Sequence, residues 1–215
     1  MHPNQTFRRT PEARSIAFVR DRAFGILALS SCDGAPLLSH VPFLLSEDGT
    51  FAELHLVRSN PICRALVRGA EPGAPARIAV SGPDGYVSPD WYGLGPDQVP
   101  TWNYVAVHLT GTLTPLPAQT LPDMLRRLSD HFEERPPKPP WRMDKLTPDT
   151  RDKLLRMILP FRFRVETVDS TWKLGQNKPD DARQSAAEAL ETGVGHELGA
   201  LSALMQTPPV TEHDD

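Results

Sequence analysis

A candidate anion site lies where a strand-like run meets the start of a helix. The run that begins at Phe51 ends in Arg58, Ser59 and Asn60, and Pro61 suits the first turn of a helix. Backbone N–H groups at a helix start, joined by a guanidinium and a hydroxyl, can bind a phosphate. The alternative is that Asn60 only caps the helix and Arg58 is a surface residue. The local pattern leaves both open.

Aromatic residues are concentrated in one stretch of the chain. Tyr86, Trp91, Tyr92, Trp102 and Tyr104 lie within or beside one loop and the strand that follows it. Aromatic faces stack on flat conjugated ligands, and neighbouring amides and hydroxyls can bind ring heteroatoms. Subunit interfaces are enriched in the same aromatic residues. The stretch therefore predicts a ligand wall, a dimer interface, or both.

The strand predicted from Trp102 to Pro115 has two faces of different character. Its apolar face carries Val105, Val107, Leu109 and Leu113. The opposite face carries Trp102, Tyr104, His108, Thr110 and Thr112. A face of aromatic and hydrogen-bonding side chains is unusual for a sheet surface that is only in contact with water. It favours the same two interpretations, a ligand wall or an interface.

A third candidate segment follows a late strand and contains a lysine beside two amides. Lys173, Gln176 and Asn177 lie near a turn, where they could hold an anion or a ring carbonyl. A plain polar turn is the alternative. His40, His55 and His108 are the candidate general acids or bases, and no catalytic residue is assigned.

Other chemistries lack their motifs. The chain has no phosphate loop, no G-x-G-x-x-G opening a helix and no G-x-S-x-G elbow. Its seven histidines do not form a metal-binding spacing, so no metal is expected. A basic recognition helix is also missing, and the net charge of −4 disfavours direct nucleic-acid binding.

Composition predicts an ordinary soluble protein of the cytoplasm. The 215 residues are 39% hydrophobic and 23% charged. The start of the chain resembles no signal peptide, and no run reaches the roughly 18 apolar residues of a membrane span. Cys32 and Cys63 are expected to be reduced thiols, since two cysteines make no disulfide framework.

The apolar periodicities predict a mainly β protein with attached helices. A helix opening at Thr10 precedes an antiparallel meander, and about six strands are expected to form a small barrel. We expect one domain over residues 1–206, with peripheral helices within 120–159, a C-terminal helical segment at 181–206 and a flexible tail at 207–215. Thr120 and Asp123 are expected to form a capping box for the first peripheral helix.

Four of these segments together resemble a known family. They are His55-Leu-Val-Arg-Ser-Asn-Pro61, Tyr86-Val-Ser-Pro-Asp-Trp-Tyr92, Val99-Pro-Thr-Trp-Asn-Tyr-Val-Ala-Val-His108 and Trp172-Lys-Leu-Gly-Gln-Asn177. Their order and spacing are similar to those of the PaiB family of FMN-binding negative transcriptional regulators, from about Phe7 to Met205. The run from Val99 to His108 is the most specific of the four.

The resemblance implies a fold, a cofactor and a site. The fold would be an FMN-binding split β-barrel similar to pyridoxamine-phosphate oxidases and flavin reductases, and the protein a homodimer with FMN at the subunit interface. Phosphate-side groups would be Arg58, Ser59 and Asn60. Ring or interface groups would be Ser88, Trp91, Thr101, Trp102, Asn103 and Tyr104, and the site would be closed by Lys173, Gln176 and Asn177. Gly175 and Asp90 stand where the family commonly has serine.

Several functions are compatible with this resemblance. The protein could be an FMN-dependent oxidoreductase, because FMN itself carries hydride and electron chemistry. It could instead be a flavin-responsive negative regulator that acts through another protein without contacting DNA directly. A haem-binding dimer and a family member without cofactor are the remaining alternatives. The sequence does not choose between enzyme and regulator.

Overall fold

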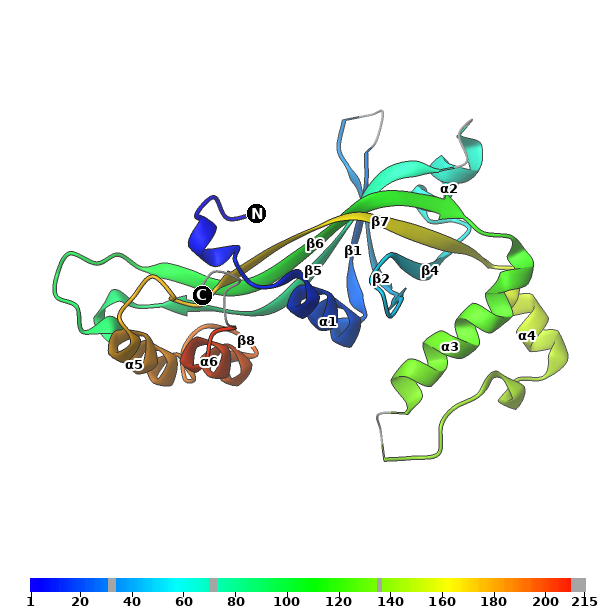
Figure 1. The fold of residues 1–215 in the computed structure, drawn as a ribbon. Coiled ribbons are helices and arrows are strands. Elements are labelled where there is room, and N and C mark those ends of the chain that lie inside the picture. The colour runs from blue at the N-terminus through cyan, green and yellow to red at the C-terminus, as the bar shows by residue number, and fades with distance from the viewer. Residues whose placement is uncertain (31–33, 70–72, 135–136, 210–215) are drawn as a thin grey trace. The chain divides into compact units, whose positions relative to one another are not determined.

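The chain divides into two compact units. The computed structural model describes residues 1–30, 34–69, 73–134 and 137–209 (Figure 1). Unit 1 comprises Met1–Phe18, Val80–His108 and Val168–Asp215, and unit 2 comprises Val19–Ala79 and Leu109–Thr167. The predictions made for Cys32 and for residues 210–215 of the tail fall outside the described residues. The single domain expected over 1–206 stays a prediction.

The strands of the described residues form one sheet with the order β2-β1-β5-β6-β7-β4-β3, and β8 pairs with β5. Their bounds are β1 Phe24–Leu29, β2 Leu37–Pro42, β3 Leu44–Leu45, β4 Phe51–Val57, β5 Ala74–Val87, β6 Thr101–Pro115, β7 Ile158–Lys173 and β8 Gly195–His196. Antiparallel registers join β1 to β2 and β5, β4 to β3 and β7, and β5 to β8. The predicted antiparallel meander is confirmed.

Six α-helices and four short 3-10 helices accompany the sheet within the described residues. They are α1 Glu12–Arg22, α2 Pro61–Arg68, α3 Leu121–Glu133, α4 Pro148–Leu155, α5 Asp180–Leu190 and α6 Leu198–Gln206, with η1 Gln5–Phe7, η2 Pro89–Tyr92, η3 Ala118–Thr120 and η4 Met143–Lys145. The C-terminal helical segment is therefore two short helices, α5 and α6, which pack together in unit 1 (Figure 1).

Two helix starts follow the sequence prediction and one does not. Asn60 caps α2 by accepting the N–H of Ile62 at 2.9 Å, and Thr147 caps α4. The capping box expected for α3 is wrong. Thr120 is itself in a helical conformation after η3, and its hydroxyl donates to the carbonyl of Pro117 at 2.8 Å. Asp123 binds arginines instead of a backbone N–H.

Two strands are longer than their sequence pattern predicted. The Gly-, Pro- and Asp-rich stretch after Gly82 is typical of a loop, but β5 continues to Val87. Proline commonly ends a helix, but α4 already ends at Leu155 and Pro160 lies inside β7. There Pro160 lies opposite His55 in the β4 register, and its carbonyl accepts the N–H of Leu116.

Each unit has its own apolar core. In unit 1 the buried cluster contains Val87, Tyr92, Val105, Trp172, Leu174, Ala182, Ala186, Ala187, Leu190, Leu201 and Met205. In unit 2 the most deeply buried side chains include Phe43, Leu54, Ile62, Phe161 and Phe163. The alternation predicted for β6 is confirmed, because Val105, Val107, Leu109 and Leu113 are all buried.

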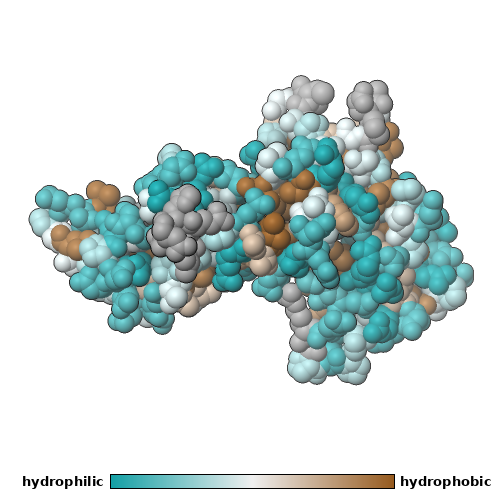
Figure 2. Space-filling model, viewed as in Figure 1, coloured by the Kyte–Doolittle hydropathy of each residue, from teal (hydrophilic) through white to brown (hydrophobic). Residues whose placement is uncertain are grey.

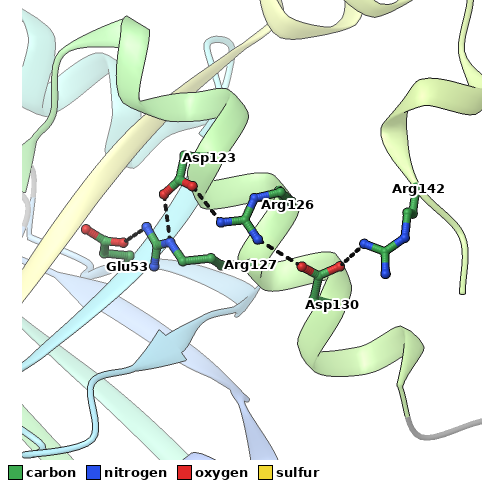
Figure 3. Close-up of polar contacts among 6 residues, drawn as sticks. All are labelled: Glu53, Asp123, Arg126, Arg127, Asp130 and Arg142. Carbon is green, nitrogen blue, oxygen red and sulfur yellow. Dashed lines mark hydrogen bonds and ion pairs between the residues drawn. The ribbon is translucent and has the colours of Figure 1, made fainter.

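A buried carboxylate attaches α3 to the sheet in unit 2. Glu53 of β4 is 4% exposed and accepts a hydrogen bond from Arg127 at 2.5 Å (Figure 3) and another from Arg162 at 2.7 Å. Burial by itself would raise the pKa of Glu53, but the bonds from the two arginines outweigh it and hold that pKa below its ordinary value. Glu53 therefore stays ionised at neutral pH.

Hydrophobic residues also reach the surface. On the face shown in Figure 2 they form separate patches within a mostly hydrophilic surface. In unit 1 the exposed large hydrophobic residues are Met1, Leu94, Val99, Trp102 and Val194, and in unit 2 they are Phe24, Leu38, Val57, Val67, Leu154 and Met157. Among the described residues, no helix is long and apolar enough to span a membrane.

Candidate functional site

A cavity of about 280 Å³ in unit 1 brings together four of the residues predicted from sequence. Thr101, Asn103, Lys173 and Asn177 line it, and they come from the ends of β6 and β7 and from the turn after β7. The rest of its lining is His2, Phe7, Tyr92, Asp97, Gln98, Val99 and Lys178. Its size is near the lower end of small-molecule sites, about 300 Å³.

Lys173 lies in this cavity without a carboxylate partner. Its ammonium donates a hydrogen bond to the hydroxyl of Thr101 and lies 5.8 Å from the centre of the Phe7 ring. Among the described residues it forms no ion pair. Burial lowers the pKa of Lys173, because the charged form is partly removed from water. The side chain thus presents a cation held only by neutral groups.

Asn103 supplies an unsatisfied acceptor beside that cation. The residue is 1% exposed, and its amide nitrogen donates to the sulfur of Met205 at 3.4 Å. Its carbonyl oxygen is buried and has no hydrogen-bond partner among the described residues. A buried acceptor without a donor is costly, by about 1–3 kcal/mol. A ligand N–H or O–H at this atom would remove that cost.

A second lysine and a buried tyrosine complete the cavity wall. Lys178 donates to the side-chain oxygen of Gln98, and its ammonium lies 5.1 Å from the centre of the Tyr92 ring. Burial raises the pKa of Tyr92, so its hydroxyl stays protonated at neutral pH. Asp97 is the one carboxylate in the lining. The cavity therefore carries more positive than negative side chains.

The N-terminal residues form part of the cavity, which the sequence analysis missed. The backbone N–H of His2 donates to the hydroxyl of Thr171 at 3.1 Å, and the His2 ring meets the Phe7 ring edge to face at 4.9 Å. Burial, followed by the nearby Lys173 charge, lowers the pKa of His2. No local sequence signal precedes the His2–Thr171 contact, since it joins residues 169 positions apart.

The turn after β7 explains the roles of its two amides. Gly175 has a φ of +81°, which an L side chain rarely adopts. Gln176 folds back on this turn, because its oxygen accepts the N–H of Leu174 and its nitrogen donates to the carbonyl of Trp172. Both ends of the Gln176 amide are thus used by the backbone, whereas Asn177 lines the cavity.

The other ring residues predicted from sequence lie on the opposite face of β6. Trp102 is 41% exposed and donates its indole N–H to Asp84 at 2.9 Å. Tyr104 is on the same face and is half-buried. Thr101 and Asn103, two of the cavity residues, alternate with them along the strand. One strand therefore presents two separate groups of candidate residues.

Ser88 caps the short helix η2 in unit 1, and Trp91 lies within that helix. The Ser88 hydroxyl caps η2 by accepting the N–H of Asp90 at 3.3 Å. Trp91 is half-buried and meets the edge of the Tyr86 ring at 6.3 Å. The carboxylate of Asp90 is exposed. Neither Ser88 nor Trp91 lines the cavity that contains Lys173.

The predicted phosphate-side residues belong to unit 2 and are partly used by the fold. The Asn60 nitrogen donates to the Ser39 hydroxyl at 2.9 Å, and its oxygen caps α2. The Arg58 guanidinium donates to the carbonyl of Arg156 at 2.7 Å, and Ser59 is exposed. The capping interpretation of Asn60 is confirmed. A phosphate at these residues stays a prediction.

None of the three candidate histidines lines the cavity that contains Lys173. His40 is exposed on β2, and His108 is half-buried on β6. His55 is the most enclosed, since its Nδ1 atom is buried without a hydrogen-bond partner, and burial lowers its pKa. Within the described residues, no cluster of three or more histidine, cysteine or acidic side chains could hold a metal. Cys63 is buried, which raises the pKa of its thiol.

Residues 1–167 of the chain match the family described as "Putative FMN-binding domain". The chain belongs to this family. FMN, the cofactor expected from the sequence, is the cofactor by which the family is defined. Among its relatives is the Protease synthase and sporulation protein PAI 2 of Bacillus subtilis (strain 168), 28% identical over 192 residues that cover 88% of each protein. The resemblance to the PaiB family is therefore confirmed.

Solved structures support the expected fold. The FAD and heme binding protein from Mycobacterium smegmatis is 24% identical, with a TM-score of 0.58 over 88% of this chain and 82% of that one. The flavocytochrome Anf3 from Azotobacter vinelandii is 14% identical, with a TM-score of 0.57 over 81% and 73%. These likenesses establish the fold alone, and the predicted split β-barrel with helices is confirmed.

Proposed function

We propose that this member of the FMN-binding family is a flavin-dependent redox protein, and that the polar edge of the flavin ring lies in the unit 1 cavity. One observation carries the proposal: Lys173, which has no carboxylate partner among the described residues, lines the same cavity as Asn103, whose buried carbonyl oxygen has no hydrogen-bond partner there. A site that offers one acceptor and one cation suits a ring that has both N–H and carbonyl groups.

The residues that line the cavity suit a flavin ring in their polarity and in their flat apolar surfaces. The Asn103 oxygen would accept a ring N–H, which removes the cost of its missing partner. Lys173 and the Thr101 hydroxyl would meet ring carbonyl or nitrogen acceptors. Phe7 and Tyr92 give the cavity flat apolar surfaces against which a conjugated ring can pack.

The protein's own contribution is electrostatic. FMN supplies hydride and electron transfer, and the protein supplies binding and orientation. Lys173 is held by a hydroxyl and an aromatic face, so its positive charge is not neutralised and favours a ligand that gains negative charge. Because the hydroxyl of Tyr92 stays protonated, it can donate a hydrogen bond but does not add a competing charge.

We further propose a homodimer in the cytoplasm, with the cofactor site at the subunit interface and no direct contact with DNA. The exposed Trp102 and half-buried Tyr104 support an interface on that face of β6, because interfaces are enriched in such residues. The net charge of −4 supports the absence of DNA contact. Light scattering after size exclusion would measure the dimer, and Trp102→Glu should convert it to monomers.

The first experiment is the visible spectrum of the purified protein during titration with FMN and then with NADH or NADPH. The proposal expects saturable flavin binding, and a flavin band that bleaches when the nicotinamide is added. Asn103→Leu keeps the branching of the side chain but removes the acceptor, so FMN affinity should fall about tenfold, which corresponds to about 1.4 kcal/mol. Lys153→Met, an exposed lysine on α4, is the control and should bind FMN normally.

The outcomes separate the alternatives. Bleaching by a nicotinamide supports a redox enzyme. Bound flavin that no nicotinamide reduces would favour the flavin-responsive regulator, and a Soret band on adding haemin without flavin uptake would favour the haem-binding alternative. Full flavin affinity in Asn103→Leu would refute the placement of the ring in this cavity.

A further inference from the structure

Two adjoining cavities meet around Trp141 in unit 2, and their linings share no residue with the flavin cavity. One has a volume of about 280 Å³ and the other about 160 Å³. Both are lined by Ser129 of α3 and by Trp141 and Met143 of the segment that joins α3 to α4. The smaller cavity is closed further by Leu125, Leu146, Leu154, Leu155 and Ile158.

Several apolar side chains around the two Trp141 cavities are only partly buried by the rest of the protein. The helix α4 has no fully buried residue, and Leu154 on it is 46% exposed. Leu125, Leu146 and Leu155 are only half-buried. An isolated helix of this length is marginal in water, so most of its stability must come from apolar contact. A molecule between α3 and α4 would supply the missing burial, worth about 25 cal/mol per Å² of apolar surface.

Polar contacts fix Trp141 in place while the cavity beside it remains. Its backbone N–H donates to Glu133 at 2.9 Å, and the next residue, Arg142, donates to Asp130 at 3.0 Å. Both carboxylates belong to α3. Figure 3 shows the Asp130–Arg142 contact and the further pair between Asp130 and Arg126. The backbone at Trp141 is thus tied to α3 by polar contacts.

The charges around the cavities determine the class of ligand. Arg126 and Arg142 share Asp130, and Arg151 is paired with Asp152 at 3.1 Å. The arginines of the lining therefore already have carboxylate partners, and the exposed Asp144 would repel an anion. What remains is an apolar interior with one hydroxyl, that of Ser129.

We propose that the Trp141 cavities are a binding site for a neutral, largely apolar small molecule of aromatic size, with its flat face against Trp141 and one polar atom near Ser129. A molecule of this class matches both the volume and the polarity. A second copy of the chain is the competing occupant. The site would operate independently of the flavin cavity, because the two share no residue.

The test uses the neutral probe N-phenyl-1-naphthylamine, whose fluorescence rises in apolar surroundings. The full-length protein should bind it saturably at one site. Ser129→Phe fills the volume that both cavities share, and Leu154→Gln makes the wall polar without touching the core. Each should weaken probe binding about tenfold or more, equal to about 1.4 kcal/mol. Leu38→Gln, another exposed apolar residue on β2, is the matched control and should bind normally.

Two further measurements identify where the probe lies. Energy transfer from tryptophan to the bound probe should fall strongly in Trp141→Phe, although three of the four tryptophans remain. Excess FMN should leave the probe bound; displacement would place it in the flavin cavity and refute the proposal. The proposal is also wrong if no variant changes probe affinity, or if Leu154→Gln converts an oligomer to monomers, since a second copy would then cover this face. Circular dichroism checks that each variant is folded.

Discussion

Lys173 at the end of β7 donates a hydrogen bond to Thr101 at the start of β6, the neighbouring strand in the sheet. The two side chains come from different sequence motifs that are 72 positions apart. Their contact places a partly desolvated ammonium in the cavity that also contains the free carbonyl of Asn103. The first prediction follows from this geometry.

Removing the Lys173 charge should weaken FMN binding. Lys173→Met should raise the FMN dissociation constant about tenfold, or about 1.4 kcal/mol, whereas Lys173→Arg should retain most of the affinity. Because burial lowers the pKa of Lys173, the wild-type affinity should also fall as pH rises, with a midpoint below the ordinary lysine pKa of about 10.4. Quenching of FMN fluorescence measures both effects.

Thr101→Val tests the same contact from the other strand. It removes the acceptor of the Lys173 hydrogen bond but keeps the charge, so its effect should be smaller than that of Lys173→Met and should not abolish the pH dependence. An alkaline midpoint that persists in Lys173→Met would assign the titration to another group and contradict the prediction.

The sequence identified the residues of this cavity only where a motif carried them. Thr101, Asn103, Lys173 and Asn177 lie in two of the four family-like segments, so their types and spacing were visible. His2 and Lys178 were missed, because their places depend on contacts between distant segments that leave no local periodicity.

Restoring serine at Gly175 should cost stability. Its φ of +81° is strained for any L side chain, and this penalty is roughly 1–2 kcal/mol. The nearest side-chain atom to an added Cβ is Arg183 Cγ at 3.4 Å, an ordinary contact, so strain rather than collision sets the loss. Urea unfolding of Gly175→Ser and Gly175→Ala should give similar losses.

Comparing Gly175→Ser with Gly175→Ala also separates the effect of backbone strain from the effect of the serine hydroxyl. If serine binds FMN more tightly than alanine at equal stability, the hydroxyl supplies a ligand contact. If both variants were as stable as the wild type, the turn must adopt a different backbone conformation from the one described.

The errors in predicting the fold have identifiable physical causes. Pro83, Asp84 and Gly85 resemble a loop in sequence, yet they lie inside β5, where Asp84 and Gly85 pair with β8, more than 100 residues later. The Thr120 and Asp123 pattern resembles a capping box, but Asp123 binds Arg126 and Arg127 more favourably than a backbone N–H. In both places a distant or charged partner overrides the local pattern, whereas the alternation within β6 needed no such partner and was predicted correctly.

Neutralising Glu53 should destabilise unit 2 in a pH-dependent way. Its pKa is lower in the folded protein than in the unfolded chain, so the ionised form stabilises the fold above the unfolded value of about 4.3. This stabilisation is lost as pH falls through the lower folded pKa. Glu53→Gln should cost about 1–3 kcal/mol at neutral pH, because Arg127 and Arg162 lose their charged acceptor.

Urea unfolding at neutral pH and at about pH 3, below the usual glutamate pKa, would measure the difference. The difference in stability between the variant and the wild type should shrink as pH falls toward the acidic value, because Glu53 becomes protonated as pH approaches its lowered folded pKa. Glu166→Gln is a useful comparison, since Glu166 is an exposed partner of Arg164 and should cost little at either pH. A constant Glu53→Gln deficit across this range would show that the charge is not the cause.

The last prediction concerns Gly195, where the backbone of β8 approaches β5. A Cβ added at Gly195 would lie 2.2 Å from the carbonyl oxygen of Asp84, and the residue also has a φ of +154°. Because the obstructing atom is backbone, Gly195→Ala must separate β8 from β5 and loosen the start of α6. Gly199→Ala, inside α6 with open space around it, should instead stabilise by about 0.5–1 kcal/mol.

Thermal unfolding and amide hydrogen exchange of the two variants measure the contrast. Gly195→Ala should lower the melting temperature and speed exchange at the backbone N–H of Tyr86, which donates to Val194. Gly199→Ala should leave that exchange unchanged, since it alters no contact of β8. Equal melting temperatures in both variants would mean that β8 is not held against β5 in solution. The C-terminal helices would then depend only on their apolar contacts with the rest of unit 1.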